Sequence, residues 1–149
     1  MKPEHAVALQ HTVEALLGAE SAGERLAAVC RVLQALPHYT GVYIYALEGD
    51  MLVLKAFHGR ATGHTRIPSG KGICGASVLT RAPVTVVDVG SDPRYLACNL
   101  ETKSEIVFPI IRGETYLAQI DVDSDDRAAF GAEDEDLLAE VAKLLAPLF

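Results

Sequence analysis

The sequence predicts an α+β fold, in which one antiparallel sheet of about six strands is flanked by helices near the N- and C-termini. Two observations carry this prediction. Apolar residues recur at helical spacing near both ends of the chain, and the β-rich runs between them are joined in pairs by tight turns. The chain shows no internal repeat and no linker, so we expect residues 1–149 to form a single domain.

The helices are predicted from their apolar spacing and their end signals. A first helix is expected over residues 3–17, with Gly18 closing it. Ser21 is a suitable N-cap for a second helix that runs to Leu36, and Pro37 ends it. The last helix begins near Asp134. The residues expected on the inner faces of the second helix and of the C-terminal helix are Leu26, Val29, Cys30, Leu33, Leu36, Leu137, Leu138, Val141, Leu144 and Leu145.

The strands are predicted from β-rich runs and from the turns between them. Glu48-Gly49-Asp50 joins runs at 41–48 and 51–57, and Arg112-Gly113-Glu114 joins runs at 104–111 and 115–122. The segments between these two hairpins are expected to form a long loop at 58–70, a short helix at 72–80, a strand at 83–87 and an irregular stretch at 88–101.

Composition excludes several classes of function. The formal net charge of -7 and the lack of a basic cluster argue against nucleic-acid binding. No apolar run approaches the ~18–20 residues of a membrane span, and the N-terminus lacks a signal-peptide core, so we expect a cytoplasmic protein. Cys30, Cys74 and Cys98 are too few for a disulfide scaffold. They should be free thiols unless a reaction pairs two of them.

Three carboxylates and one thiol are candidates for a common site. Asp121 and Asp123 lie two residues apart in a predicted strand, so their side chains point to the same face. Glu105 lies on the preceding strand, seven residues after Cys98. Such a cluster is costly to assemble unless it binds a cation or performs chemistry.

Structural roles are the alternative for the same residues. The two aspartates could hydrogen-bond the turn at Ser124-Asp125, and Glu105 could form a salt bridge with Arg66 or Lys71. Cys30 lies on the inner stripe of the second helix and is expected in the core. No His or Cys spacing is that of a zinc site, so no metal is expected.

Three segments together resemble the GAF domain: Gly70-Lys71-Gly72-Ile73-Cys74-Gly75, Ser104-Glu105-Ile106-Val107-Phe108-Pro109-Ile110 and Asp121-Val122-Asp123-Ser124. Within that superfamily the chain is most similar to the free methionine-(R)-sulfoxide reductases, over nearly its whole length. The resemblance implies a GAF fold, thiol-dependent reduction of free L-methionine-(R)-sulfoxide and a thioredoxin-type reductant. It also implies that no cofactor is bound and that the protein is a homodimer.

The resemblance also implies roles for individual residues. Cys98 matches the catalytic thiol and Cys74 a second active-site cysteine, while Glu105, Asp121 and Asp123 match the pocket carboxylates. Two aromatic residues complete the set, because Tyr43 matches one that packs round the substrate and Tyr39 stands where the family usually has tryptophan.

Two features depart from the family pattern. His64 occupies the place of a third cysteine that is often the resolving thiol, which leaves Cys74 as the expected resolving thiol. Asp92-Pro93-Arg94-Tyr95 is typical of sensory GAF domains. The alternative function is therefore a non-catalytic, stand-alone GAF module that binds a small ligand for signalling. A purely structural dimerisation domain would explain the helices but not the carboxylates.

The implied chemistry needs a thiolate and an acid. A cysteine thiolate attacks the sulfoxide sulfur while the oxygen is protonated, and Cys98 becomes a sulfenic acid. Crowded carboxylates repel one another, so at least one of them should stay protonated near neutral pH. The remaining negative charge would attract the ammonium of a free amino acid. A second thiol then forms a disulfide with Cys98, and a thioredoxin-type protein reduces it. Cys74 lies beside two glycines at the start of the predicted short helix, a position that lowers the pKa of a thiol, and the alternative is a packed structural thiol.

Overall fold

Within residues 1–96 and 101–149, which the computed structural model describes, six strands form one antiparallel sheet in the order β3-β2-β1-β6-β5-β4. The strands are β1 Gly41–Glu48, β2 Met51–Gly59, β3 Arg66–Pro68, β4 Val84–Val86, β5 Ser104–Arg112 and β6 Thr115–Ser124. The helices are α1 Pro3–Gly18, α2 Ala22–Gln34, α3 Gly72–Thr80 and α4 Ala132–Leu145, with short 3₁₀ turns at Val89–Ser91 and Ala146–Leu148. The predicted α+β fold is confirmed.

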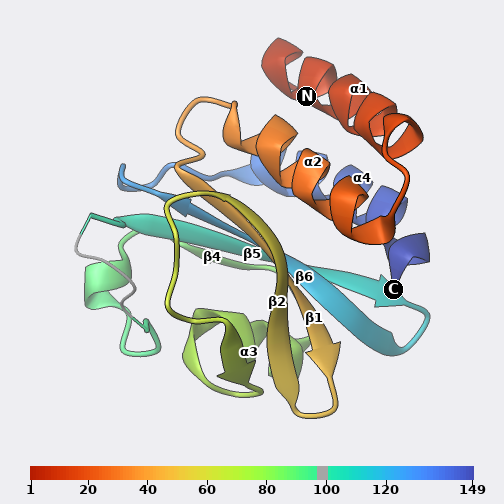
Figure 1. The fold of residues 1–149 in the computed structure, drawn as a ribbon. Coiled ribbons are helices and arrows are strands. Elements are labelled where there is room, and N and C mark those ends of the chain that lie inside the picture. The colour runs from red at the N-terminus through yellow and green to blue at the C-terminus, as the bar shows by residue number, and fades with distance from the viewer. Residues whose placement is uncertain (97–100) are drawn as a thin grey trace.

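Helices cover both faces of the sheet (Figure 1). α2 and α4 lie on one face with α1 packed outside them, and α3 lies on the other face. The Ser21 hydroxyl caps α2 by accepting a hydrogen bond from the Glu24 amide at 3.1 Å, as the sequence predicts. None of the helices in the described part of the chain is long and apolar enough to cross a bilayer.

Two segments differ from the sequence predictions. The expected long loop at 58–70 contains β3, which pairs with the start of β2. A strand of only three residues is too short to show a periodic pattern, and Pro68 suits an edge position. The first helix is predicted from an apolar spacing that includes Val7 and Leu17, but in α1 these two residues are exposed and the buried ones are His5, Ala8 and Thr12.

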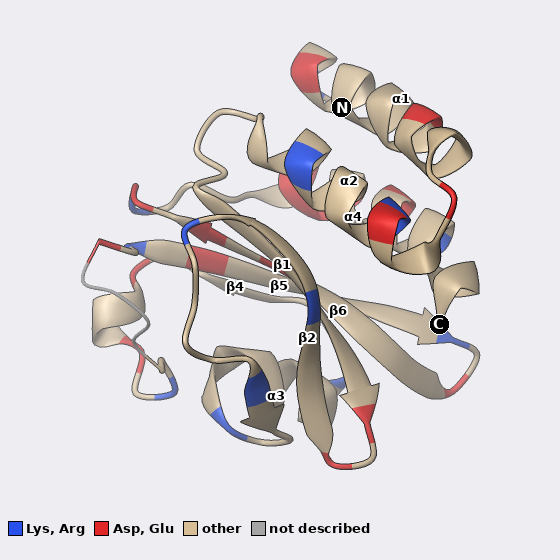
Figure 2. Ribbon diagram, in the orientation of Figure 1, with Lys and Arg blue, Asp and Glu red and all other residues tan. Residues whose placement is uncertain are grey.

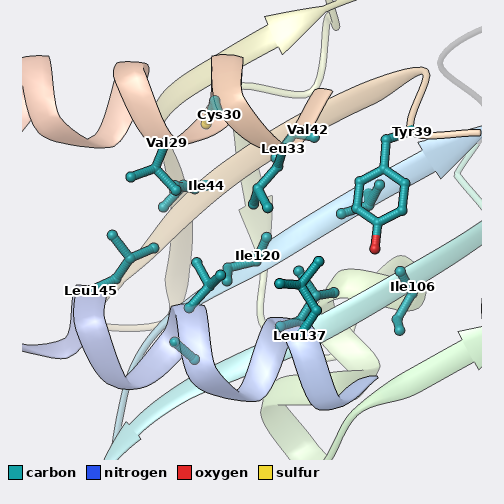
Figure 3. Packing of buried hydrophobic residues seen from close by; sticks show 14 of the residues in the cluster. Val29, Cys30, Leu33, Tyr39, Val42, Ile44, Ile106, Ile120, Leu137 and Leu145 are labelled. Carbon is teal, nitrogen blue, oxygen red and sulfur yellow. The ribbon is translucent and has the colours of Figure 1, made fainter. Parts of the chain in front are cut away.

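Strand alternation divides the buried residues into two groups. Val42 and Ile44 of β1 join residues of α2 and α4 in a helix-side core, part of which is drawn in Figure 3. Tyr43 and Tyr45 of the same strand join residues of α3 in a pocket-side cluster. Each fully buried aliphatic side chain of the helix-side core contributes roughly 1.5–3 kcal/mol. The helix-side core therefore holds the sheet in place, and the opposite face is left to form a site.

Candidate active site

Glu105, Asp121 and Asp123 lie together on the face of the sheet that α3 covers. Glu105 on β5 is paired with Asp123 on β6, and Asp121 is paired with Tyr43 on β1. Directly opposed residues of an antiparallel pair share a face, and like charges there are destabilising. The three carboxylates are nonetheless buried, with 5%, 6% and 8% of their surface exposed. Acidic segments are visible in red within the sheet in Figure 2.

α3 brings Cys74 against this acidic cluster. The Cys74 thiol donates a hydrogen bond to Oε1 of Glu105 at 3.9 Å. Gln119 of β6 fixes the same turn of the helix, because its Nε2 donates to the Cys74 carbonyl at 3.1 Å. Gly75 allows this packing, since a Cβ there would lie 2.8 Å from the backbone nitrogen of Gly70. A glycine at this position is thus a requirement for the placement of Cys74.

A small pocket lies over the Cys74 thiol and the three carboxyl groups. Its described lining consists of Tyr45, His64, Ile67, Ile73, Cys74, Tyr95, Leu96, Glu105, Asp121 and Asp123. The space open to the centres of water molecules is ≈ 30 Å³. That is room for about two water molecules.

The electrostatics of the pocket favour protonated groups. Burial raises the pKa of Glu105 well above its ordinary 4.5, and the adjacent Asp121 raises it further. Burial also raises the pKa of Asp123 well above 3.8, with the charge of Glu105 adding to the effect. Such carboxyl groups can stay protonated at pH values where an exposed carboxylate has lost its proton. Each is then available as a proton donor.

Cys74 is a neutral thiol in this environment. Burial raises its pKa well above the ordinary 9.0, and the charges of Asp121 and Glu105 raise it further. The prediction that the start of α3 lowers this pKa is wrong, because desolvation and two nearby carboxylates outweigh the first turn of a helix. Cys74 therefore needs a base before it can act as a nucleophile.

One wall of the pocket is the loop that follows β2. The Tyr43 hydroxyl donates to the carbonyl of Arg60, and the Tyr45 hydroxyl donates to the carbonyl of His64 at 2.7 Å. The Arg60 guanidinium donates to both carboxylate oxygens of Asp125, at 2.9 and 2.8 Å. Hydrogen bonds thus connect this loop to β1 through its backbone and to the segment after β6 through the Arg60 side chain.

The structure corrects the placement of Tyr39. Its ring belongs to the helix-side core, on the far face of the sheet from the pocket (Figure 3). Its hydroxyl donates to Oδ1 of Asp134 at 2.7 Å, and its ring lies edge-on to Phe130 with centroids 5.5 Å apart. Tyr39 precedes β1, where it fills the gap beside α4, so it does not line the site.

The other sequence candidates have different outcomes. Cys98 lies outside the described residues. Tyr43 shares the pocket face, but it is absent from the lining, and its ring stacks on Phe57 with centroids 6.0 Å apart. In the part of the chain that the structure describes, no ion pair joins Glu105 to Arg66 or Lys71.

The lining residues that were not predicted as site residues include Tyr45 and His64. Tyr45 has a sequence signal, because it lies two residues after Tyr43 and shares its face of β1. For His64 the signal comes only from the resemblance, which aligns it with a family cysteine, because the sequence around it carries no local pattern that places a loop residue at a pocket. One metal-compatible group also exists among the described residues. Ligand atoms of Cys74, Glu105 and Asp121 lie within 4.8 Å of one another.

The chain is similar in sequence and in structure to known proteins. A GAF domain model matches residues 21–147. The free methionine-R-sulfoxide reductase of Saccharomyces cerevisiae is 40% identical over 110 residues, which are 72% of this chain but 61% of that protein. The chain therefore spans less than two thirds of this curated relative.

Two solved structures are similar over most of their length. The type II free methionine-R-sulfoxide reductase of Thermoplasma acidophilum is 43% identical, with 85% of this chain and 91% of that chain covered and a TM-score of 0.82. The free methionine-R-sulfoxide reductase of Neisseria meningitidis, solved in complex with its substrate, is 30% identical. It aligns with 100% of this chain and 92% of its own, at a TM-score of 0.90.

Proposed function

The chain belongs to the GAF domain family, and we propose that it reduces free L-methionine-(R)-sulfoxide to methionine, with Cys98 as the nucleophile. The observation that carries the proposal is the convergence of Cys74, Glu105, Asp121 and Asp123 on one pocket. Relatives named as reductases of this substrate support it. A buried acidic cluster also suits a free amino acid, because its ammonium can pair with carboxylates whereas a peptide nitrogen cannot.

In the first step the Cys98 thiolate attacks the sulfoxide sulfur. Glu105, protonated because its pKa is raised, donates its proton to the sulfoxide oxygen. The oxygen is transferred to the cysteine sulfur, so methionine and a Cys98 sulfenic acid form and Glu105 is left as a carboxylate. Cys98 is oxidised by two electrons and the substrate is reduced by two.

In the second step Cys74 resolves the sulfenic acid. The Glu105 carboxylate, 3.9 Å from the Cys74 sulfur, accepts the thiol proton as that sulfur attacks Cys98. The proton returns to the departing hydroxide, so the products are one disulfide and one water molecule. A thioredoxin-type dithiol reduces the disulfide and restores both thiols. Glu105 thus supplies the base that the raised pKa of Cys74 demands.

The test is thioredoxin-coupled NADPH consumption with free L-methionine-(R)-sulfoxide as substrate. We expect turnover by the wild-type protein and none by Cys98→Ser. Cys30→Ala is the matched control, because Cys30 is buried in the helix-side core, where burial raises its pKa to about 12. It should keep full activity.

Failure of the wild-type protein with both thioredoxin and dithiothreitol would overturn the reductase. The non-catalytic GAF module that binds a small ligand would then be the better account. Pairing into a homodimer, which the resemblance implies, stays a separate prediction. Light scattering after size-exclusion chromatography checks it.

A further inference from the structure

Cys74, Glu105 and Asp121 form a group of metal-ligand type inside the pocket. They come from α3, β5 and β6, and one ligand atom of each lies within 4.8 Å of the other two. All three residues are buried, with 6%, 5% and 6% of their surface exposed. Because they belong to three different elements, no local Cys or His spacing reveals the group, which is why the sequence predicts no metal.

The distances within this group suit a small divalent cation. In a tetrahedral zinc site, bonds of about 2.3 Å to sulfur and about 2.0 Å to oxygen place those two atoms roughly 3.5 Å apart. The Cys74 sulfur and Oε1 of Glu105 are 3.9 Å apart, so a small shift would bring both to bonding distance. Asp121 accepts hydrogen bonds from Cys74 and Glu105, and a cation bound by all three side chains takes the place of the protons in those bonds.

A buried oxygen next to this group has no donor. Gln119 is fully buried on β6, two residues before Asp121 and on the same face of the strand. Its Nε2 donates to the Cys74 carbonyl at 3.1 Å and to the Tyr116 hydroxyl at 3.0 Å, which places the amide group against the turn that carries the thiol. Its Oε1 has no hydrogen-bond partner within the described part of the chain. Such an oxygen is costly, and a cation or a water molecule bound to a cation satisfies it.

The set of donor atoms selects the metal. Magnesium and calcium take oxygen ligands, whereas zinc binds both cysteine sulfur and carboxylate oxygen. Three protein ligands leave one position of a tetrahedral zinc ion for water. The pocket supplies that position, since its ≈ 30 Å³ open to the centres of water molecules lies over the same side chains.

We propose that Cys74, Glu105 and Asp121 bind one zinc ion, with a water molecule in the pocket as the fourth ligand. Zinc bound in this way occupies the sulfur and the carboxyl group that the proposed resolving step uses, so it acts as a reversible inhibitor. The binding site stands on the geometry of the described residues, and the inhibition rests on the proposed function.

The test of the site is metal binding, measured without any turnover. Cobalt(II) is the probe, because a cobalt–thiolate bond gives a charge-transfer absorption band, and zinc is added afterwards. The protein carries Cys98→Ser, so that Cys74 and Cys30 are the two thiols left. A phosphine keeps them reduced, because dithiothreitol itself binds zinc. We expect one cobalt ion per protein molecule, the thiolate band, and loss of the band when zinc displaces cobalt.

Three variants on this background assign the ligands. Cys74→Ser should lose the thiolate band, and Cys30→Ala, the matched control in the helix-side core, should keep it. Glu105→Gln keeps the thiol but should weaken zinc binding by about tenfold or more, and it answers the question if Cys74→Ser does not fold. The inference is overturned if the parent protein binds no metal, if the band survives in Cys74→Ser, or if Glu105→Gln binds zinc as tightly as the parent.

Activity separates this inference from the proposed function. Wild-type protein loaded with one equivalent of zinc and freed of excess metal should lose about tenfold or more of its thioredoxin-coupled turnover, and EDTA should restore it. Full turnover with zinc still bound would overturn the inhibition. Protein that binds zinc but has no activity even after EDTA would overturn the reductase and leave the metal site standing.

Discussion

The Cys74 thiol and the Glu105 carboxyl, 3.9 Å apart, are the central pair of the proposed mechanism. Cys74 is too deeply buried to act early, but it can act once Glu105 has given up its proton. Its contribution is therefore confined to the recycling of Cys98. This order separates the chemical step from the resolving step, and the two can be measured independently.

Cys74→Ala should remove thioredoxin-dependent turnover but keep the chemical step. Without a resolving thiol the Cys98 sulfenic acid persists, and thioredoxin has no intramolecular disulfide to reduce. We expect thioredoxin-supported turnover to fall by at least about tenfold, with dithiothreitol-supported turnover nearly unchanged. A single-turnover assay should still yield about one methionine per protein molecule. Loss of the single turnover would contradict the resolving role.

Glu105→Gln should change the pH dependence of stability as well as the rate. The folded protein holds the Glu105 proton at pH values where the unfolded chain, with a pKa of 4.5, has lost it. The stabilising contribution of this carboxyl is therefore complete below pH 4.5 and is lost as pH rises toward the raised pKa.

Glutamine has no such proton, so the free energy of unfolding should decline less steeply with pH in the variant. The difference in slope can reach about 1.4 kcal/mol per pH unit. Urea unfolding at acidic and mildly alkaline pH measures it. The same variant should lose about 10²–10⁴ in kcat if Glu105 is the acid. Parallel stability curves for the two proteins would exclude a raised pKa for Glu105.

At the scale of elements, the sequence predicts best what local signals encode. Ser21 and Gly18 mark helix ends, and Gly49 and Gly113 mark hairpin turns, so these elements are predicted well. The same alternation that defines β6 also predicts that Asp121 and Asp123 share a face, because side-chain direction in a strand is a local property.

What the sequence does not predict depends on distant contacts. β3 exists only because the start of β2 pairs with it. His64 lies at the pocket because Tyr45 binds its carbonyl, and Tyr39 lies away from it because Asp134 of α4 accepts its hydroxyl. The direction of the Cys74 pKa is also set by the fold, since burial is its largest cause.

Two glycines in helices should respond oppositely to alanine. In α3, a Cβ on Gly75 would meet the backbone of Gly70 at 2.8 Å and the Pro68 carbonyl at 3.0 Å. Gly75→Ala should therefore displace α3 and lower stability by about 1–3 kcal/mol, with loss of activity. Gly23→Ala in α2 meets nothing within 4 Å and should raise stability by about 0.5–1 kcal/mol. Thermal and urea unfolding measure the change in stability of each variant. An unchanged stability in Gly75→Ala would contradict the close approach of α3.

For the whole molecule, the sheet separates the residues that stabilise the fold from those proposed to perform chemistry. The helix-side core is apolar, with Tyr39 satisfied by Asp134. The opposite face carries three buried carboxyl groups, and burial raises the pKa of two of them, Glu105 and Asp123. A site of this kind lowers stability, and the other face of the sheet must compensate.

A pair of conservative substitutions on opposite faces tests this division. Asp123→Asn should raise the free energy of unfolding at pH 8 by at least about 1 kcal/mol, because it removes a buried carboxyl whose pKa is raised. It should also reduce kcat/KM by about tenfold or more, because a charge for the substrate ammonium is lost.

Tyr39→Phe, on the other face of the sheet, should change stability and leave substrate binding as it is. Loss of its hydrogen bond to Asp134 should lower stability by about 1–2 kcal/mol and leave KM unchanged. Urea unfolding measures the free energy of unfolding of both variants, and steady-state kinetics measure their kcat and KM. A raised KM in Tyr39→Phe would return this residue to the site, whereas a destabilised Asp123→Asn would mean that the carboxylate stabilises the fold.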